Sequence, residues 1–177
     1  AFLTQQAGFD CMGAMMRLYD NDILPPADSK TCCSLDDSED ARSVAFRLGM
    51  PFYVFNSKAE FEEKVIRKFI SCYECGATPN PCIECNRHLK FDHFLRKALV
   101  LGCDYIVTGH YARIRYDEAT CRYLLLKAAD VTKDQSYVLY CLTQEQLSHT
   151  LLPLGEMTKS EVRAIAEEKG FINARKH

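Results

Sequence analysis

The chain has 177 residues, of which 47% are apolar and 26% charged, so it can bury the core of one ordinary domain, or of a domain with a small appendage. This composition excludes a disordered tail, and apolar runs shorter than roughly 18 residues exclude a membrane-spanning helix. The net charge of -2 gives no overall basic field, so a polyanionic partner would need a local basic patch. The opening AFLTQQAGFD lacks signal-peptide features, and we expect a cytoplasmic protein.

In chain order, the apolar stretch 8–19 predicts a buried strand, and the polar, proline-containing stretch 20–34 predicts a loop. Apolar residues at helical spacing then predict a helix over 35–48. Ser34, followed by acidic residues, is its expected N-cap, and Gly49 its expected C-cap.

The next stretch repeats the alternation of strand and helix. A short strand is expected at 51–56, and Ser57 is expected to cap a second helix. After a loop at 76–82, helical spacing resumes near 89–101 and leads into a strand at 103–109. This order predicts an α/β domain with a parallel sheet.

A hairpin and two helices are expected in the rest of the chain. The hairpin strands are predicted at 112–116 and 122–126, on either side of the turn DEATCR. The helices are predicted near 143–149 and 158–169, and the second starts with a capping box of Thr158 and Glu161.

In open parallel sheets, ligands collect beyond the carboxyl ends of the strands. Three segments follow such ends, namely Met16–Asp20, the loop after Asn56, and Thr108–Arg113. The last contains Gly109 and His110. A histidine in such a loop is at least as often a satisfied structural residue as a catalytic one.

Ten cysteines are the outlier of the composition. A disulfide scaffold fits poorly, because such scaffolds are usually short, secreted and rich in loops. Cys11, Cys103 and Cys141 lie in apolar runs and are expected to pack as small hydrophobic residues. The informative cluster consists of two C-x-x-C pairs, which are Cys72 with Cys75 and Cys82 with Cys85.

The loop 77–91 places Cys82 and Cys85 at the start of a helix, where the partial positive charge of the helix end favours a thiolate. Nearby basic residues would add to this effect, namely Arg87, His88 and Lys90. A zinc site made of all four clustered cysteines is the alternative. Its short spacer is restricted by two prolines, which disfavours that reading.

Two further polar groups stand out. The segment KDQSY (133–137) could contact phosphate or ribose, or could be a solvated loop with a helix cap. A second group could form a local nucleic-acid patch, or an ordinary charged helix face. Its basic residues are Arg87, Lys90, Arg96 and Lys97, with His88 and His93 beside them.

Several motifs together resemble one family. These are TCCSLDDSEDARSVAFRLGMPFYVFN, TPNPCIECNRHLKF, VTGHYARI, KDQSYVLYCL and LPLGEMTKSEVRAIAEEKGF. They occur in the order of the bacterial tRNA-specific 2-thiouridylases (MnmA/TrmU type), and the resemblance covers nearly the whole chain. It implies a Rossmann-like parallel sheet of the adenine-nucleotide alpha-hydrolase (PP-loop ATPase) type, truncated, with a small hairpin and a helical C-terminal extension.

The resemblance implies the domain boundaries as well. Residues 1–142 would form the truncated PP-loop ATPase-like α/β domain, and 143–177 the start of a helical, tRNA-binding region.

The resemblance also implies an enzyme that thiolates the wobble uridine of tRNA. In the family, ATP, with Mg²⁺ expected, adenylates the C2 oxygen of the uracil. A persulfide on one cysteine, loaded by a sulfur-donor protein, then attacks. A second cysteine completes the exchange through a disulfide. A thiolate suits this step, and the base must leave its stack to be reached.

Carried over residue by residue, Cys85 matches the family's nucleophilic cysteine. The segment of Asn80, Pro81 and Cys82 matches the one that contacts the target base, although many relatives carry Asp in place of Cys82 and its proton-transfer role is open. Nucleotide contacts match Met16 and Gly109. The tRNA contacts match His110, Lys133, Asp134 and Gln135.

Cys72 and Cys75 have no counterpart in the family. With Cys82 and Cys85 they could hold zinc or an iron–sulfur cluster, and a metal-binding interaction module is the alternative function. Within the family reading, the C-x-x-C of Cys82 and Cys85 could supply two cluster ligands.

The family begins with a glycine-rich, SGGVDSS-like pyrophosphate loop, whereas this sequence opens at a segment that matches the following helix. The second cysteine and the β-barrel domains of the family have no counterpart either. We therefore expect the 177-residue chain by itself to lack thiolation activity. The measurement is ATP- and sulfide-dependent formation of 2-thiouridine in tRNA, and detectable product would contradict the expectation.

Overall fold

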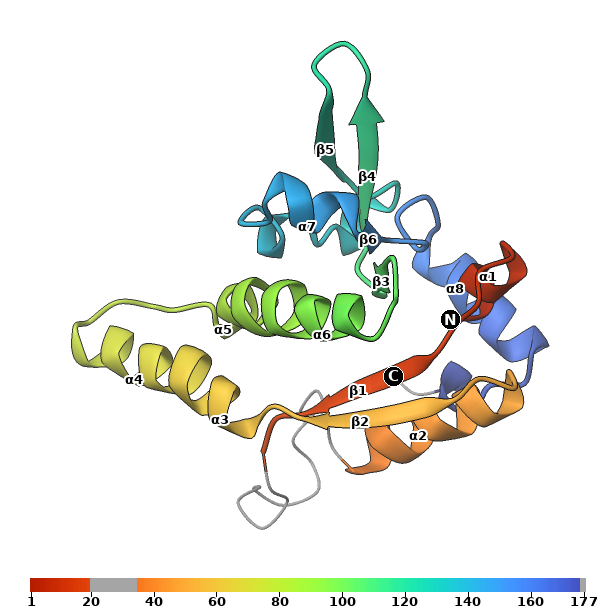
Figure 1. Ribbon diagram of the computed structural model, residues 1–177, viewed down its shortest axis with the longest axis horizontal. Helices are drawn as coiled ribbons and strands as arrows, with labels where there is room; N and C mark the ends of the chain where they lie inside the picture. Colours follow the sequence, from red (N-terminus) through yellow and green to blue (C-terminus); the bar gives the residue numbers. More distant parts are fainter. Residues whose placement is uncertain (20–34, 176–177) are drawn as a thin grey trace. The chain divides into compact units, whose positions relative to one another are not determined.

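The computed structural model describes residues 1–19 and 35–175 (Figure 1). The loop expected at 20–34 and the cap expected at Ser34 lie outside the described residues. The chain divides into two compact units. The first unit is residues 1–62 with 164–177, and the second unit is residues 63–163.

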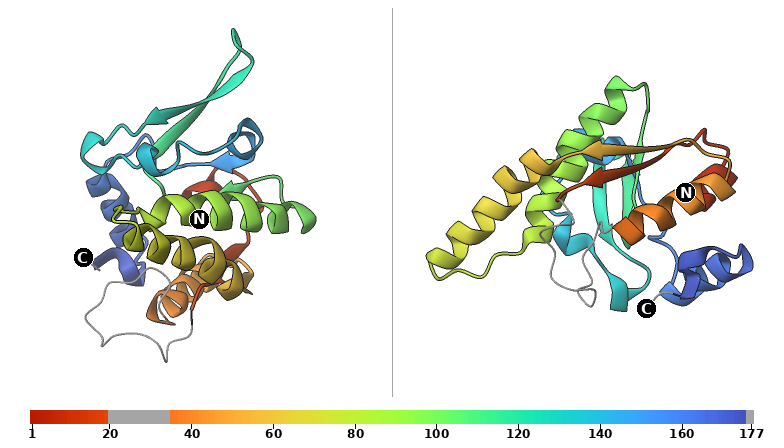
Figure 2. Two further views of the ribbon diagram at one scale, coloured as in Figure 1. Left: turned by 90° about the vertical axis from the view of Figure 1, so that its left-hand side faces the viewer. Right: turned by 90° about the horizontal axis from the view of Figure 1, so that it is seen from below.

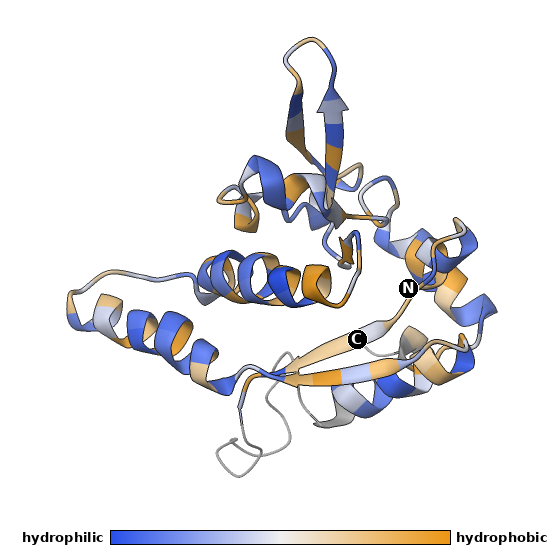
Figure 3. Cartoon of the chain, in the orientation of Figure 1, coloured by the Kyte–Doolittle hydropathy of each residue, from blue (hydrophilic) through white to orange (hydrophobic). Residues whose placement is uncertain are grey.

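The first unit is built on two parallel strands, β1 (Gly13–Arg17) and β2 (Phe52–Asn56), paired from Gly13 opposite Phe52 to Arg17 opposite Asn56. The helix α2 (Leu35–Arg47) packs against both strands. Both strands are largely apolar (Figure 3), as expected for a pair that a helix covers. The helix and β2 occupy the ranges that the sequence predicts, whereas β1 covers only the middle of the predicted stretch 8–19 and none of its residues is fully buried.

Short helices complete the first unit: α1 (Phe2–Gln6), α3 (Lys58–Phe61) and the 3-10 turn η6 (Ile172–Arg175). The turn η6 packs against α2, and Arg47 Nη1 donates to the Gly170 carbonyl over 2.8 Å. Gly49, the predicted C-cap of α2, has a φ of +67°, which favours glycine.

Ser57 precedes α3 but does not act as the predicted side-chain cap. Its hydroxyl is buried and has no hydrogen-bond partner among the described residues. Its backbone N–H instead donates to the Arg17 carbonyl over 2.9 Å, which continues the pairing of β1 with β2. Ser57 therefore continues the strand pairing at the point where the sequence predicts the start of a helix.

A helix without a break runs through the second unit. It consists of α5 (Pro81–Glu84), a π-helical stretch η3 (Cys85–Phe94) and α6 (Leu95–Val100). We call it the cysteine helix, because it carries Cys82 and Cys85. It begins earlier than the spacing near 89–101 predicts, since Pro81 is accommodated in the first turn, where no N–H bond is lost.

Another helical run, η2 (Glu62–Ile66) followed by α4 (Arg67–Glu74), comes before the cysteine helix. The remaining helical turns are η4 (Val131–Lys133), η5 (Ser136–Val138), α7 (Gln144–Ser148) and α8 (Lys159–Glu168). The predicted capping box at the start of α8 is present, because Glu161 N–H donates to Thr158 Oγ1 and Thr158 N–H to Glu161 Oε2. No helix in the described residues is long and apolar enough to cross a membrane.

The strands of the second unit form two pairs. β3 (Ile106–Val107) pairs in parallel with β6 (Thr150–Leu151), which the sequence analysis did not foresee. β4 (Ala112–Asp117) and β5 (Arg122–Lys127) form the predicted antiparallel hairpin. In Figure 1 and in the left view of Figure 2, the hairpin projects away from the helices of its unit. Parallel strand pairs with helices confirm the α/β class.

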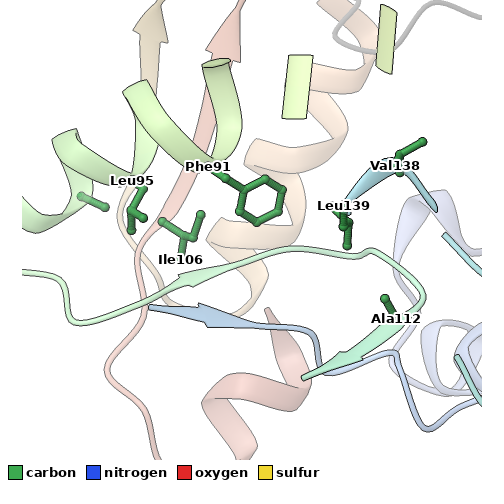
Figure 4. Close-up of a cluster of buried hydrophobic side chains, with 7 residues drawn as sticks. Phe91, Leu95, Ile106, Ala112, Val138 and Leu139 are labelled. Carbon is green, nitrogen blue, oxygen red and sulfur yellow. The ribbon is translucent and has the colours of Figure 1, made fainter. Parts of the chain in front are cut away.

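The core of the second unit joins the cysteine helix to the segments that follow it. Phe91 and Leu95 from the helix meet Ile106 of β3 and Leu139, which follows η5 (Figure 4). Phe91 and Leu139 are fully buried. Burial of such a side chain contributes about 1.5–3 kcal/mol to stability, so this contact fixes how the cysteine helix sits in its unit.

Gly155 is required by a close backbone approach. A Cβ at this position would overlap the Ala112 carbonyl and lie 2.8 Å from Arg113 Cγ. We expect Gly155→Ala to lower the free energy of unfolding by about 1–3 kcal/mol, measured by urea denaturation. Gly109→Ala is the matched control, since its Cβ would make an ordinary 3.7 Å contact with Leu154. Equal stability of the two variants would refute this account.

Candidate functional site

The start of the cysteine helix is held by its own sequence. Asn80 lies at the N-cap, and its Oδ1 accepts a hydrogen bond of 3.0 Å from the Cys82 N–H. Pro81 follows at the first helical position. Cys82 is exposed and Cys85 half-buried. Asn80 and Pro81 therefore fix the backbone from which both thiols project.

A carboxylate next to Cys85 gathers three basic groups. Glu84 lies 2.8 Å from Lys68 Nζ, 3.5 Å from Arg87 Nη1 and 3.2 Å from His88 Nε2. Partial burial opposes ionisation of Glu84, but Lys68 and the other basic groups outweigh it and hold its pKa below the usual range. Arg87 and His88 were expected to favour a thiolate, but Glu84, which the sequence did not single out, offsets part of their charge.

Arg87 also reaches a second thiol. Its guanidinium bonds the side chain of Cys141, and this contact is the main reason that the Arg87 pKa lies above its ordinary value. Cys141 is half-buried, whereas Cys103 packs against the core as predicted. Cys11 is half-buried, and its thiol donates to the Phe9 carbonyl over 3.4 Å.

Asn86 ties the cysteine helix to the segment 133–139. It is 1% exposed, and its Nδ2 donates to the Val138 carbonyl over 3.2 Å. Its Oδ1 is buried without a partner among the described residues. The sequence analysis missed this residue. The available signal was its place three residues before Leu89, on the apolar face of the helix.

The segment around His110 packs on the same helix. The His110 ring lies 5.8 Å from the Phe91 ring, and its Nδ1 is 2.8 Å from Thr108 Oγ1. Burial, with a smaller effect of the Lys90 charge, lowers the His110 pKa to about 4. His110 is therefore a neutral imidazole near pH 7.

Gln135 clamps this segment through two hydrogen bonds. Its backbone N–H donates to the Tyr111 carbonyl over 2.8 Å, and its Oε1 accepts from the Tyr111 N–H over 2.9 Å. The carboxylate of Asp134 accepts from the Ala128 N–H and from Ser136 Oγ, both over 2.8 Å. Burial opposes ionisation of Asp134, but these bonds keep its pKa below the usual value. The side chain of Lys133 is exposed.

Three segments that are far apart in the sequence thus meet in the second unit. Asn86 contacts Val138, Phe91 contacts His110, and Gln135 contacts Tyr111. Gly109 is exposed beside His110. Met16 belongs to the first unit, where it lies half-buried on β1 opposite Phe55. The structure therefore packs the cysteine helix, through Asn86 and Phe91, against the segments that carry His110 and Gln135, and Met16 belongs to the other unit.

The cysteines do not form the predicted alternative site. Within residues 1–19 and 35–175, no group of three or more His, Cys, Asp or Glu side chains could hold a metal ion. Cys72 and Cys75 lie at the end of α4 and belong to no such group. A zinc or iron–sulfur interaction module is therefore unsupported. The eight described cysteines are all free, so the described part of the chain gives no support for a disulfide either.

Comparison with known proteins gives a consistent answer over the whole chain. The family described as tRNA methyl transferase HUP domain matches residues 1–177. The chain belongs to this family. The resemblance read from the motifs is thereby confirmed, and the described elements agree with a truncated Rossmann-like α/β fold.

The curated relatives carry one printed name. A tRNA-specific 2-thiouridylase MnmA of Clostridioides difficile is 54% identical over 97% of this chain and 47% of its own length. A protein of the same name from Moorella thermoacetica is 53% identical over 99% of this chain and 49% of its own length. The chain spans about half the length of these relatives.

The buried His110 predicts a pH dependence of stability. Because its pKa is about 4 when folded and near 6.5 when unfolded, acidification protonates the unfolded chain first. Stability should therefore fall between pH 6.5 and 4, by up to about 3 kcal/mol from this residue.

The measurement is urea unfolding of the wild type and of His110→Gln over this pH range, and the difference between the two should change in that sense. Lys90→Met should narrow the pH range over which stability falls, because it removes one cause of the lowered His110 pKa. If the free energies of unfolding of wild type and His110→Gln changed with pH in parallel, the lowered pKa assigned to His110 would be contradicted.

Proposed function

We propose that the chain is the cysteine-bearing catalytic region of a tRNA-uridine 2-sulfurtransferase, with Cys85 as the nucleophile. The observation that carries the proposal is that the cysteine helix is fixed in place both at its start and along its length. This helix carries the half-buried Cys85, is capped by Asn80 at its start, and is held against the segments of His110 and Val138 by Phe91 and Asn86. The name shared by the curated relatives supports the substrate, since those proteins are tRNA-specific 2-thiouridylases.

The proposed reaction has three balanced steps. The C2 oxygen of uracil attacks ATP, which forms an adenylated base and releases pyrophosphate. The terminal sulfur of a Cys85 persulfide attacks C2, and AMP leaves with the oxygen. A second thiolate then attacks the Cys85 sulfur, which releases 2-thiouridine and leaves a disulfide. Adenylation is needed because a urea-like carbonyl is a poor electrophile, and a thiolate is a strong nucleophile.

The remaining predicted residues would surround this chemistry. Cys82 and the Asn80–Pro81 turn would face the target base, and the exposed Lys133 would meet phosphate. His110 would act as a neutral hydrogen-bonding group, because its pKa of about 4 removes its charge near neutrality. Asp134 and Gln135 would act by holding the loop at Tyr111. Gly109 would contact the nucleotide, and the nucleotide contact of Met16, in the first unit, stays a prediction from the resemblance.

The described donor sets do not fit a resident metal. No three of the described His, Cys, Asp and Glu side chains converge, so the described residues hold no complete ligand set for an iron–sulfur cluster. Mg²⁺ would come with the phosphates of ATP, where it needs few protein ligands. The proposed partners are tRNA, ATP and a persulfide-donor protein, and the proposed location is the cytoplasm.

The test is a chimera in which residues 1–177 replace the matching half of the Clostridioides difficile relative. We expect the chimera to form 2-thiouridine in tRNA with ATP and a persulfide donor. Cys85→Ser should abolish product. It should also abolish the persulfide that the donor forms on the protein, measured as a mass gain of one sulfur atom.

The matched control is Cys75→Ser, which removes an exposed thiol at the end of α4 and should leave product formation within about 2-fold of the parent chimera. A chimera that folds, binds tRNA and keeps its activity after Cys85→Ser would refute the assignment of the nucleophile.

A further inference from the structure

A cavity of about 280 Å³ lies at the base of the hairpin, and neither Cys82 nor Cys85 lines it. The hairpin contributes Arg113, Tyr116 and Tyr123 to its walls, and the other side includes Tyr105, Ser148 and Glu156. All of these residues belong to the second unit. The volume suits one planar ring system rather than a whole nucleotide.

The tyrosines give this cavity aromatic walls that remain accessible. Tyr116 is 48% exposed and Tyr105 is 41% exposed. The rings of Tyr116 and Tyr123 lie with their centroids 5.0 Å apart, at an angle of 57°. Exposed aromatic rings at a cavity are the usual stacking surface for unpaired bases.

The walls are held in place without a ligand. Gln144 accepts from the Tyr123 N–H over 2.8 Å and donates to the Tyr123 carbonyl over 3.0 Å. Arg113 Nε donates to the Lys127 carbonyl over 2.7 Å, and its Nη1 lies 3.3 Å from Glu156. A preformed cavity binds with less loss of conformational entropy than one that must be ordered.

The charges around the cavity favour a base over other planar ligands. Glu156 is exposed and can accept hydrogen bonds from ring and exocyclic N–H groups, while its ion pair with Arg113 leaves this part of the cavity without a strong net charge. Arg115 and Arg122 are exposed on the same hairpin, and neither forms an ion pair within the described residues. They can meet the phosphates that flank a base.

From this arrangement we propose that the cavity binds one unpaired base of the RNA substrate, as a second base site besides the one at Cys85. The hairpin begins at Ala112, two residues after His110, so the same stretch of chain reaches both places. The inference rests on the proposed function, because it requires an RNA substrate.

The experiment is fluorescence anisotropy of the full chain with a labelled RNA stem–loop, and with a fully paired duplex as a second probe. Tyr116→Ala and Tyr123→Ala should each weaken stem–loop binding about 5-fold or more, and should leave duplex binding unchanged. Tyr116→Phe should stay close to wild type, because the ring is kept. Tyr73→Ala, an exposed tyrosine on α4, is the matched control and should have no effect.

Stem–loop binding that is unaffected by Tyr116→Ala would overturn the proposal, and is the result expected if a protein segment occupies the cavity. Equal weakening of duplex binding, or no RNA binding by the wild-type chain, would overturn it as well. Thermal unfolding of each variant checks that the fold is retained. Tyrosine-dependent RNA binding together with an inactive chimera would refute the proposed function and keep this site.

Discussion

Burial of one face of the cysteine helix is the constraint on which the second unit depends. Phe91 and Leu89 are fully buried, and Phe91 packs in one cluster with Ile106 and Leu139 (Figure 4). This packing decides which side of the helix faces inward. Cys85, at the first position of the π-helical stretch, keeps partial access to solvent. The candidate site is therefore a consequence of how the core is filled.

Hydrogen bonds then join the segments that the core has brought together. Asn86 bonds the backbone at Val138, and Gln135 bonds the backbone at Tyr111. Gln135, which the sequence offers as a ligand contact, thus uses some of its hydrogen-bonding groups to bind the protein itself. Such residues act on a substrate through the loop they hold, while exposed groups such as Lys133 remain for direct contact.

The sequence predicted those elements whose causes are local. The capping box of Thr158 and Glu161, the hairpin and the helix α2 each follow from a pattern within a few residues. Motifs in family order predicted the family, which the comparisons confirm. Tertiary contacts were missed for a physical reason: the pairing of β3 with the two-residue β6, and the ion pair of Glu84 with Lys68 across 16 residues, exist only after folding. The hydrogen bond of the Ser57 N–H with the Arg17 carbonyl joins residues 40 positions apart and is likewise absent from the local pattern.

The π-helical stretch from Cys85 to Phe94 has a consequence for how this helix tolerates change in length. A π-helix bonds i to i+5, so each of its turns holds more residues than an α-helical turn. It therefore sets the angular offset between the thiol and the apolar stripe of the following turns. Loss of one residue there, with the winding of the other residues unchanged, would rotate Cys85 relative to that stripe by one residue's share of a turn. A loss before Asn80 would shorten the preceding loop and leave the offset intact. Insertions and deletions among relatives should accordingly occur in the loop before Asn80 and be rare in the π-helical stretch Cys85–Phe94.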